Sequence, residues 1–173
     1  NGGFGINGVN FGGSSGITKS ETAGLSYVDS FSDNQELESN YFFGGSKTKN
    51  EVSTRRENIL PDGSFFSNSD NQSVNRSNSH RANLFYSIET DTLTRIYFRP
   101  GFVYSNGDRQ SIRNSSSTNA DGELVNQLSS ENKSDFDNLS FNNNLTVTRR
   151  FKKKGAYFRL RVGNENSDNE NIS

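Results

Sequence analysis

Histidine and cysteine, two side chains often used in acid–base and metal chemistry, are nearly absent from this chain of 173 residues. His80 is the only histidine, and there is no cysteine, so thiol catalysis, disulfides and cysteine-bound zinc are excluded. A histidine that acts as a metal ligand or general base needs partners beside it, and its sequence neighbour is Arg81. We therefore expect His80 to lie at a junction between a loop and a strand, with no catalytic role.

Charged residues gather in two kinds of cluster. Five cations surround Phe151 in RRFKKKG. In a short turn between strands, we expect them to contact lipid phosphates or other anionic groups, not nucleic acid. The groups SDNQ, NGD, NADGE and SDNEN lack the spacing of a calcium-binding loop, and NADGE is typical of a turn. A cation bound in a loop stays an open alternative.

No other motif predicts chemistry. The start of the chain, GGFGINGVNFGG, has glycines but no phosphate-loop lysine, and we expect it to be a surface loop. No serine–histidine–aspartate or paired-carboxylate arrangement is present. The sequence therefore predicts no catalytic residue, no cofactor, no metal site and no enzymatic activity in this segment.

The elements that hold these residues have a period of two. Apolar and polar side chains alternate over 80–90, 94–104, 138–148 and 156–163, and more weakly over 17–28 and 36–45. Such alternation is typical of a β-strand with one apolar face, whereas Gly, Ser and Asn interrupt every helical window. The sequence predicts an all-β antiparallel meander of about six strands, with a partial strand near residues 4–11.

Composition limits what can cover the apolar face. Hydrophobic residues make up 28% of the chain and the mean hydropathy is −0.88, against roughly 45–50% apolar residues in soluble domains. A hydrophobic core of normal size cannot be built from so few apolar residues, yet 12% aromatic residues and only 2 prolines argue against disorder.

The net charge of the chain is −1, so its overall electrostatic field does not attract nucleic acid. The start at Asn1 and the lack of Met predict an internal piece of a longer protein.

The expected connections alternate in length. Short polar turns are expected at about 29–36, 89–93 and 149–155, and long Ser-, Asn- and Asp-rich loops at about 46–78 and 105–136. Short turns at one end and long loops at the other are typical of an outer-membrane β-barrel, whose short turns face the periplasm. We therefore expect residues 1–173 to be a fragment of one transmembrane β-barrel domain in the bacterial outer membrane.

In such a barrel each strand presents alternate residues to lipid and to a wet interior. Pro100 lacks a backbone donor, so we expect a bulge or a missing hydrogen bond there. The residues expected to face lipid are Leu25, Tyr41, Phe43, Leu84, Tyr86, Ile88, Ile96, Phe98, Phe102, Leu139, Phe141, Leu145, Val147, Phe158, Leu160 and Val162. The residues expected to face the lumen are Arg95, Arg99, Asn142, Asn144, Arg159 and Arg161.

Several strings also resemble a known family. ENILPDGSFFSNSDNQ is followed by SHRANLFYSIETDTLTRIYFRPGFVYS, with GITKSETAGLSYVD before them and LTVTRRFKKKGAYFRLRV after them. These strings, over about 16–163, resemble the outer-membrane β-barrel family of Bacteroidota, whose barrels are similar to the carboxy-terminal barrels of TonB-dependent receptors. The resemblance implies a large barrel with an amino-terminal carboxypeptidase-regulatory-like domain and a plug, which takes part in solute uptake or in an outer-membrane complex.

Two other classes of protein stay open. An extracellular adhesin or β-rich surface module would use the same strands in a solenoid or a sandwich, but the sequence has no fixed repeat and few large residues for a sandwich core. An enzymatic barrel needs a catalytic set that this segment lacks. The partners expected of the barrel are outer-membrane lipid, further strands of the same barrel and other outer-membrane or surface proteins.

Overall fold

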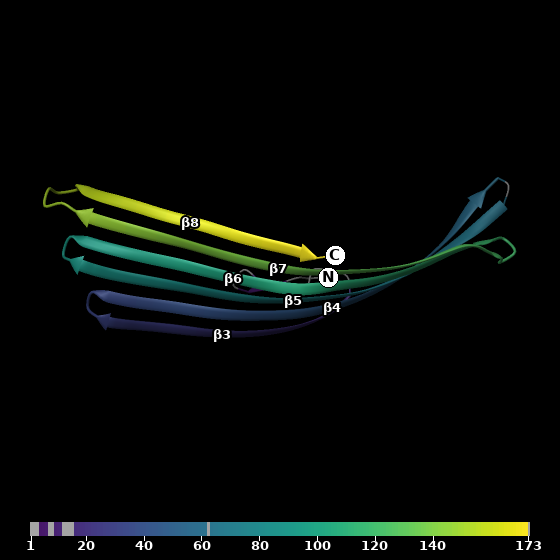
Figure 1. Cartoon of the computed structure of the whole chain (residues 1–173), viewed down its shortest axis with the longest axis horizontal. Helices are drawn as coiled ribbons and strands as arrows, with labels where there is room; N and C mark the ends of the chain where they lie inside the picture. Colours follow the sequence, from purple (N-terminus) through teal and green to yellow (C-terminus); the bar gives the residue numbers. More distant parts are fainter. Residues whose placement is uncertain (1–3, 7–8, 12–15, 62, 173) are drawn as a thin grey trace.

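The computed structural model describes residues 4–6, 9–11, 16–61 and 63–172. Within them, six long strands form one antiparallel sheet in chain order (Figure 1). No helix occurs in the described ranges, so the predicted all-β meander is confirmed. The strands are β3 (Ile17–Ser32), β4 (Gln35–Leu60), β5 (Gly63–Asp91), β6 (Thr94–Asn119), β7 (Leu124–Arg150) and β8 (Tyr157–Ile172).

The beginning of the chain forms a small hairpin of its own. β1 (Phe4–Ile6) pairs with β2 (Val9–Phe11), with Phe4 opposite Phe11. A single partial strand was expected near residues 4–11, and two short strands are found. The rest of the glycine-rich start, which was expected to be a surface loop, lies outside the described residues.

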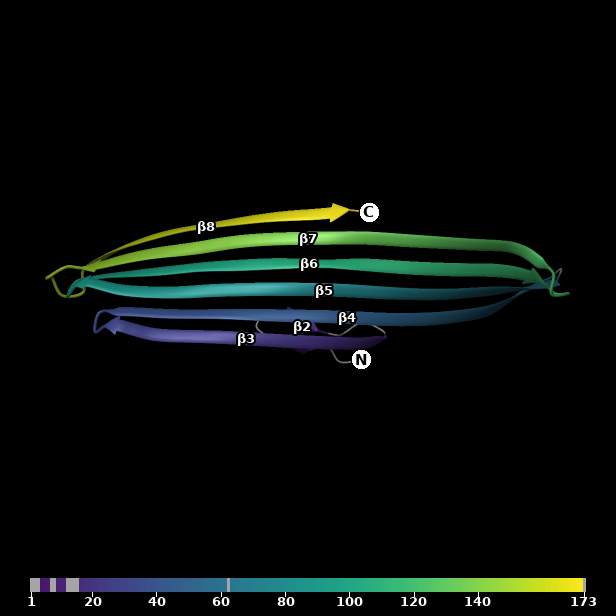
Figure 2. The same cartoon turned by 60° about the horizontal axis from the view of Figure 1, so that its bottom comes forward.

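The six-stranded sheet is open. β3 pairs only with β4, and β8 pairs only with β7. The strands therefore form a long curved wall with two free edges, which Figure 2 shows from a second direction. Each edge strand is 16 residues long, and every second residue of an edge strand points its backbone N–H and C=O away from the sheet.

The three short connections all lie at one end of the wall, on the left in Figure 1. They fall in the ranges expected for short turns, except that the last one, 151–156, extends one residue further. Neighbouring turns are joined by backbone hydrogen bonds: Glu89 N–H donates to the Asn34 carbonyl at 2.8 Å, and Arg150 N–H donates to the Leu93 carbonyl at 2.8 Å. In the last turn, Gly155 has φ of 80°, which a residue without a side chain adopts readily.

The segments 46–78 and 105–136 are not loops, which corrects the expectation from sequence. β4 and β5 remain paired as far as Leu60 and Gly63, and β6 and β7 as far as Thr118 and Leu124. Ser and Asn have low strand propensity, but in this wall their backbones are satisfied by neighbouring strands and both faces of the ribbon can be hydrated. The long connections are therefore extended β-hairpins that continue beyond β3 and β8.

Pro100 interrupts one ladder, as expected. The β5–β6 register omits the pairs that Leu84 and Phe85 would make with Pro100 and Arg99, although the register does not shift across the gap. On the other side, Pro100 keeps its place opposite Asn143 of β7. The sheet therefore accommodates Pro100 by leaving out hydrogen bonds between β5 and β6, without a bulge.

Candidate functional surface

The register of the sheet separates its two faces. Residues directly opposite each other on neighbouring antiparallel strands have side chains on the same face. One rung joins Leu37, Tyr86, Phe98, Leu145 and Val162 across β4–β8. All sixteen residues expected to face lipid fall on the face of this rung, which we call the apolar face. The sequence prediction that these residues share one face therefore agrees with the register.

The opposite face, here called the polar face, carries all six residues that were expected to face the lumen. Arg95 forms an ion pair with Glu89. The guanidinium of Arg99 lies 4.8 Å from the ring centre of Phe85 and 5.6 Å from that of Tyr97. The arginines are thus held by an acid and by aromatic rings next to the short turns, which allows cationic and apolar groups to share this face.

A hollow opens on the polar face at the same end. It measures about 510 Å³ and its lining includes Glu36, Phe85, Glu89, Tyr97 and Arg99. Carboxylate, guanidinium and aromatic groups together suit a mixed polar ligand or another segment of protein. Sequence alternation located these residues on one side of their strands, but it could not place Glu36 of β4 beside the arginines of β6.

Burial differs between the two faces. The fully buried side chains Phe42, Ser79 and Thr146 are 7–9% exposed and lie on the polar face. On the apolar face, Leu25 is 75% exposed, Leu160 47% and Phe98 37%. Among the described residues no second layer covers the apolar face, so a contiguous apolar surface lies open on the isolated sheet. An exposed patch of this extent marks an interaction with another protein or with a membrane.

The apolar face forms a band of limited height. Along β7 it runs from Arg149, opposite Phe158, to Leu139, a distance of ten residues. At a rise of about 3.4 Å per residue and a tilt of about 40°, this length covers about 26 Å, close to the ~25 Å apolar band of outer-membrane barrels. Asn143 and Asn164 share a rung within the band, a polar interruption that the sequence alternation did not predict.

Aromatic residues end the band on the side of the long hairpins. The Tyr41 hydroxyl lies 2.7 Å from His80 Nδ1, and the His80 ring lies 5.1 Å from Phe43 and 6.1 Å from Tyr104 between ring centres. The Tyr104 hydroxyl donates to Asp137 at 3.0 Å. Side chains with an apolar body and a polar tip are typical of a membrane–water boundary.

The position of His80 corrects the sequence expectation. His80 lies well inside β5, not at a junction between a loop and a strand. Its contacts are aromatic, and no group of three or more His, Cys, Asp or Glu that could hold a metal occurs in the part of the chain described here. We therefore assign His80 to the aromatic boundary.

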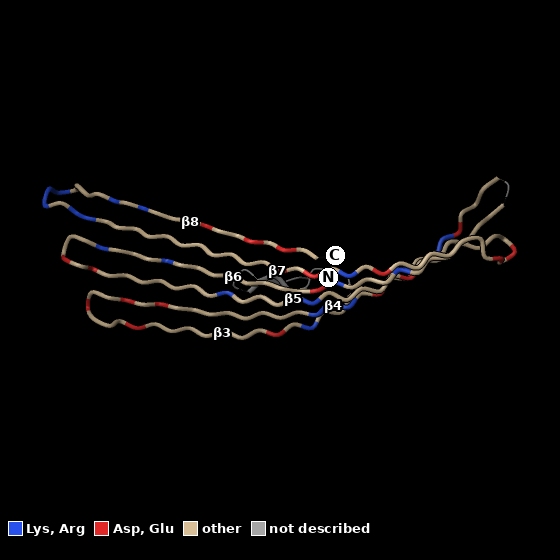
Figure 3. The backbone as a smooth tube through the Cα atoms, in the orientation of Figure 1, with Lys and Arg blue, Asp and Glu red and all other residues tan. Residues whose placement is uncertain are grey.

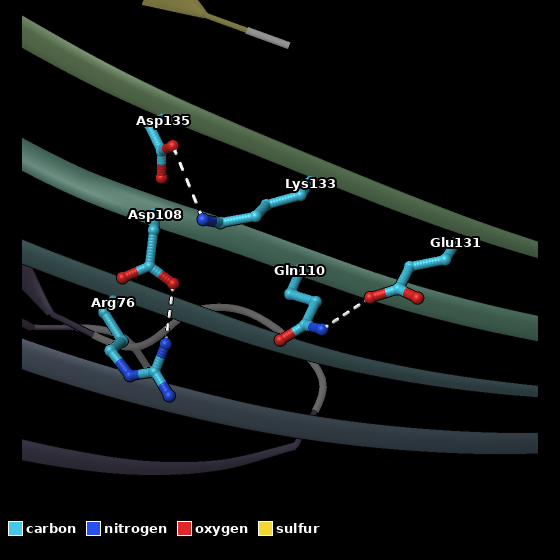
Figure 4. A network of polar contacts seen from close by, with 6 residues as sticks. All are labelled: Arg76, Asp108, Gln110, Glu131, Lys133 and Asp135. Atoms are coloured by element: carbon cyan, nitrogen blue, oxygen red, sulfur yellow. Dashed lines mark hydrogen bonds and ion pairs between the residues drawn. The ribbon is translucent and has the colours of Figure 1, made fainter.

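Beyond the aromatic boundary the same face becomes charged. Figure 4 shows Arg76 bound to Asp108 at 2.7 Å, Gln110 donating to Glu131 at 2.7 Å, and Lys133 3.8 Å from Asp135. The first two pairs bridge β5 to β6 and β6 to β7, and the third lies within β7. One face of these continuous strands therefore changes at this height from apolar to ionic side chains.

The acid and amide groups considered as cation ligands are mostly in strands. SDNQ lies in β5, NGD in β6 and SDNEN in β8, where alternate residues point to opposite faces. NADGE forms the turn that was expected: Gly122 N–H donates to the Asn119 carbonyl at 3.1 Å, and Glu123 N–H donates to Asn119 Oδ1 at 2.8 Å.

The basic turn lies at the other end of the band, between β7 and β8 (Figure 3). Arg149 lies 3.8 Å from Asp91 of the neighbouring turn. Phe151, in the middle of the cations, is exposed. Apolar and cationic side chains therefore lie together at the edge of the apolar band.

No helix in the described ranges is long and apolar enough to cross a membrane. Comparison with protein-family models and with curated proteins finds no match for this chain.

Proposed function

We propose that this chain is part of the wall of an outer-membrane β-barrel similar to TonB-dependent receptors, which serves solute uptake or belongs to an outer-membrane complex. The observation that carries the proposal is the band of apolar side chains on one face only. Its height matches the hydrocarbon layer, aromatic residues bound it, and the face behind it is polar. In this arrangement lipid covers the apolar face and water or protein fills the space behind it.

The open edges require further strands. An unpaired backbone N–H or C=O in hydrocarbon costs several kcal/mol, and β3 and β8 each have one free edge. Transmembrane barrels of one chain have at least about eight strands. We propose that additional strands of the same barrel pair with β3 and β8 and close the wall.

The polar face would then line the interior. Its arginines are fixed near the short turns by Glu89, Phe85 and Tyr97, so they form an ordered surface against which a plug or a solute can pack. The hairpins β4–β5 and β6–β7 would project from the cell surface and contact ligands or partner proteins. Most of their exposed groups are hydroxyls, amides and charges, and exposed apolar side chains such as Ile59, Leu60 and Leu124 lie near the hairpin tips.

The extended hairpins also favour a second function. Long surface hairpins with polar residues on both faces are what an extracellular adhesin or surface interaction module would present. Such a module without a membrane would have to cover the apolar band with a second protein layer. The two proposals therefore differ in what contacts Leu25, Phe98 and Leu160.

The test is the behaviour of the intact protein in cell fractions. We expect it to sediment with outer membranes, to stay there after sodium carbonate extraction, and to require detergent for release. Recovery in a detergent-free soluble fraction with native β-structure would refute the barrel and support the adhesin.

A second step separates the two roles of the barrel. The intact protein released in mild detergent should be purified and its stoichiometric partners identified. A stable partner in constant ratio supports a component of an outer-membrane complex. A protein without such a partner, together with loss of energised uptake of a solute in the deletion strain, supports transport.

A further inference from the structure

Three cations lie side by side on the apolar face, just beyond the aromatic boundary. The register places Lys19 of β3 opposite Lys47 of β4, and Lys47 opposite Arg76 of β5. Neighbouring strands are about 4.8 Å apart, and like charges directly opposite each other destabilise a sheet. Lys49 follows two residues further along β4, on the same face. We call Lys19, Lys47, Lys49 and Arg76 the basic patch.

The chain itself neutralises little of this charge. Arg76 pairs with Asp108 at 2.7 Å, and no other ion pair joins the patch to an acid among the residues that the structure describes. Glu21 lies on the next rung, opposite Gly45. Glu51 follows Lys49 by two residues on the same face, opposite Gln72. Four cations less Asp108, Glu21 and Glu51 leave a charge of +1 on this part of the face.

The patch surrounds a hollow. Gly45 is buried and forms its floor, since a Cβ there would stand 3.1 Å from Glu21 Cγ and 3.3 Å from Asn78 Oδ1. The hollow measures about 310 Å³, and its lining includes the cations Lys19, Lys47 and Arg76 together with Glu21 and Asn78. Two ammonium groups and one guanidinium group therefore border, together with one carboxylate, a space that an oxyanion of phosphate size can enter.

The position of the basic patch along the strands, next to the end of the apolar band, favours a lipid headgroup as the source of the anion. Ala23 and Phe43 form the last apolar rung before Glu21 and the patch, and His80 and Tyr104 are on that same rung. If the apolar band is in hydrocarbon, the patch is at the level of the headgroups. Figure 3 shows cations of β3, β4 and β5 gathered at this height, whereas Asp108, Asp135 and Asp137 occupy β6 and β7.

We propose that the basic patch binds the phosphate of an anionic lipid headgroup in the leaflet nearest the long hairpins. The inference rests on the proposed barrel, because only a membrane at the apolar band brings headgroups to this height. Binding supplies the countercharge that the row of cations lacks, and it orders lipid against β3–β5.

The experiment uses the intact protein in nanodiscs of phosphatidylcholine, with the phosphorylated glycolipid lipid A as the titrated probe and native mass spectrometry as readout. The test variant combines Lys19→Gln, Lys47→Gln and Lys49→Gln. The control combines Arg56→Gln, Arg109→Gln and Arg113→Gln, which removes the same charge from the polar face of β4 and β6. Circular dichroism and carbonate extraction verify folding and insertion of each variant.

Each lysine near an anionic surface contributes roughly fivefold in affinity, so we expect the test variant to bind lipid A at least about tenfold more weakly. The control variant should bind like the wild type. Equal binding by all three proteins, or an equal loss in both variants, would overturn the inference. Competition by inorganic phosphate as strong as by lipid A would also overturn it, in favour of a free anion.

Failure of this inference differs from failure of the proposed function. If the wild-type protein inserts but does not prefer lipid A over phosphatidylcholine, only the proposed lipid site is refuted. If the wild-type protein does not insert into nanodiscs or cell membranes, the proposed barrel is refuted, and the proposed lipid site is refuted with it.

Discussion

Replacement of Leu145 by arginine tests the environment of the apolar face. Leu145 shares its rung with Phe98 and Val162 and lies near the middle of the band. An arginine on the lipid face at the bilayer midplane costs about 2–4 kcal/mol. At about 1.4 kcal/mol for each factor of ten, the ratio of folded to unfolded protein should fall roughly 30-fold to 1,000-fold.

The assay is denaturant unfolding of the intact protein in phosphatidylcholine vesicles, with two arginine variants as controls. Ser140→Arg lies on the same strand but on the polar face, and should change stability little. Ile112→Arg lies on the apolar face, but on a rung with Gln72 and Glu131, beyond the band. There the cost should fall to about 0–1 kcal/mol.

The pattern of the three variants decides the outcome. A loss confined to Leu145→Arg supports lipid contact that depends on face and depth. Equal losses at Leu145 and Ile112 would point to a protein layer over the whole face, and no loss at Leu145 would point to water. Either result would refute the membrane-facing band.

Three further predictions concern the hairpins and turns. Gly107→Ala should destabilise the β5–β6–β7 region by about 1–3 kcal/mol, because the new Cβ would stand 2.2 Å from the Arg76 carbonyl oxygen and 2.6 Å from the Phe136 ring. Gly24→Ala, with contacts no closer than 3.6 Å, is its control in denaturant unfolding, and equal effects would contradict the packing. Pro100→Ala should restore a backbone donor between β5 and β6 and stabilise the folded protein by about 0.5–1.5 kcal/mol. Backbone amides of β5 and β6 around the gap at Pro100 should then exchange hydrogen more slowly than in the wild type, and unchanged exchange rates would contradict this prediction. The Leu93 N–H donates to Asp91 at 2.8 Å and is the main cause that lowers the pKa of this carboxyl. Because the folded-state pKa is lowered, the stabilisation is present at neutral pH and is lost as pH falls through that value. Unfolding midpoints of the wild type and Asp91→Asn should therefore differ at neutral pH and converge below about pH 4, and a constant difference would exclude the carboxylate as the cause.

The period of two was enough to predict which residues share a face. In 94–104, for example, the alternation separated Ile96, Phe98 and Phe102 from Arg95 and Arg99, and the register places them on opposite faces. The reason is geometric, since a strand turns each successive side chain to the other side. The short turns were marked by equally local signals, such as the polar string at 33–34.

The extent of the hairpins was not predictable in the same way. A run such as Ser115, Ser116 and Ser117 has no apolar side and low strand propensity, so it is typical of a loop. It is a strand because β5 and β7 offer backbone partners on both sides, and that information is not local. The proximity of Tyr41 to His80, and of Lys19 to Arg76 across β4, also depends on register between segments far apart in sequence.

The most direct measurement of the central claim is the accessibility of spin labels placed singly along β7. This chain has no cysteine, so labels can be introduced one at a time at residues 138–148 and, above the band, at residues 125–131. In membranes, we predict that labels at Leu139, Phe141, Leu145 and Val147 collide with oxygen and are shielded from a water-soluble nickel reagent. Labels at the alternate positions should show the reverse, and this alternation should end above Asp135, where both faces meet water. Nickel access at Leu145 equal to that at Ser140, or shielding of Leu145 from both reagents, would contradict a lipid-covered apolar face.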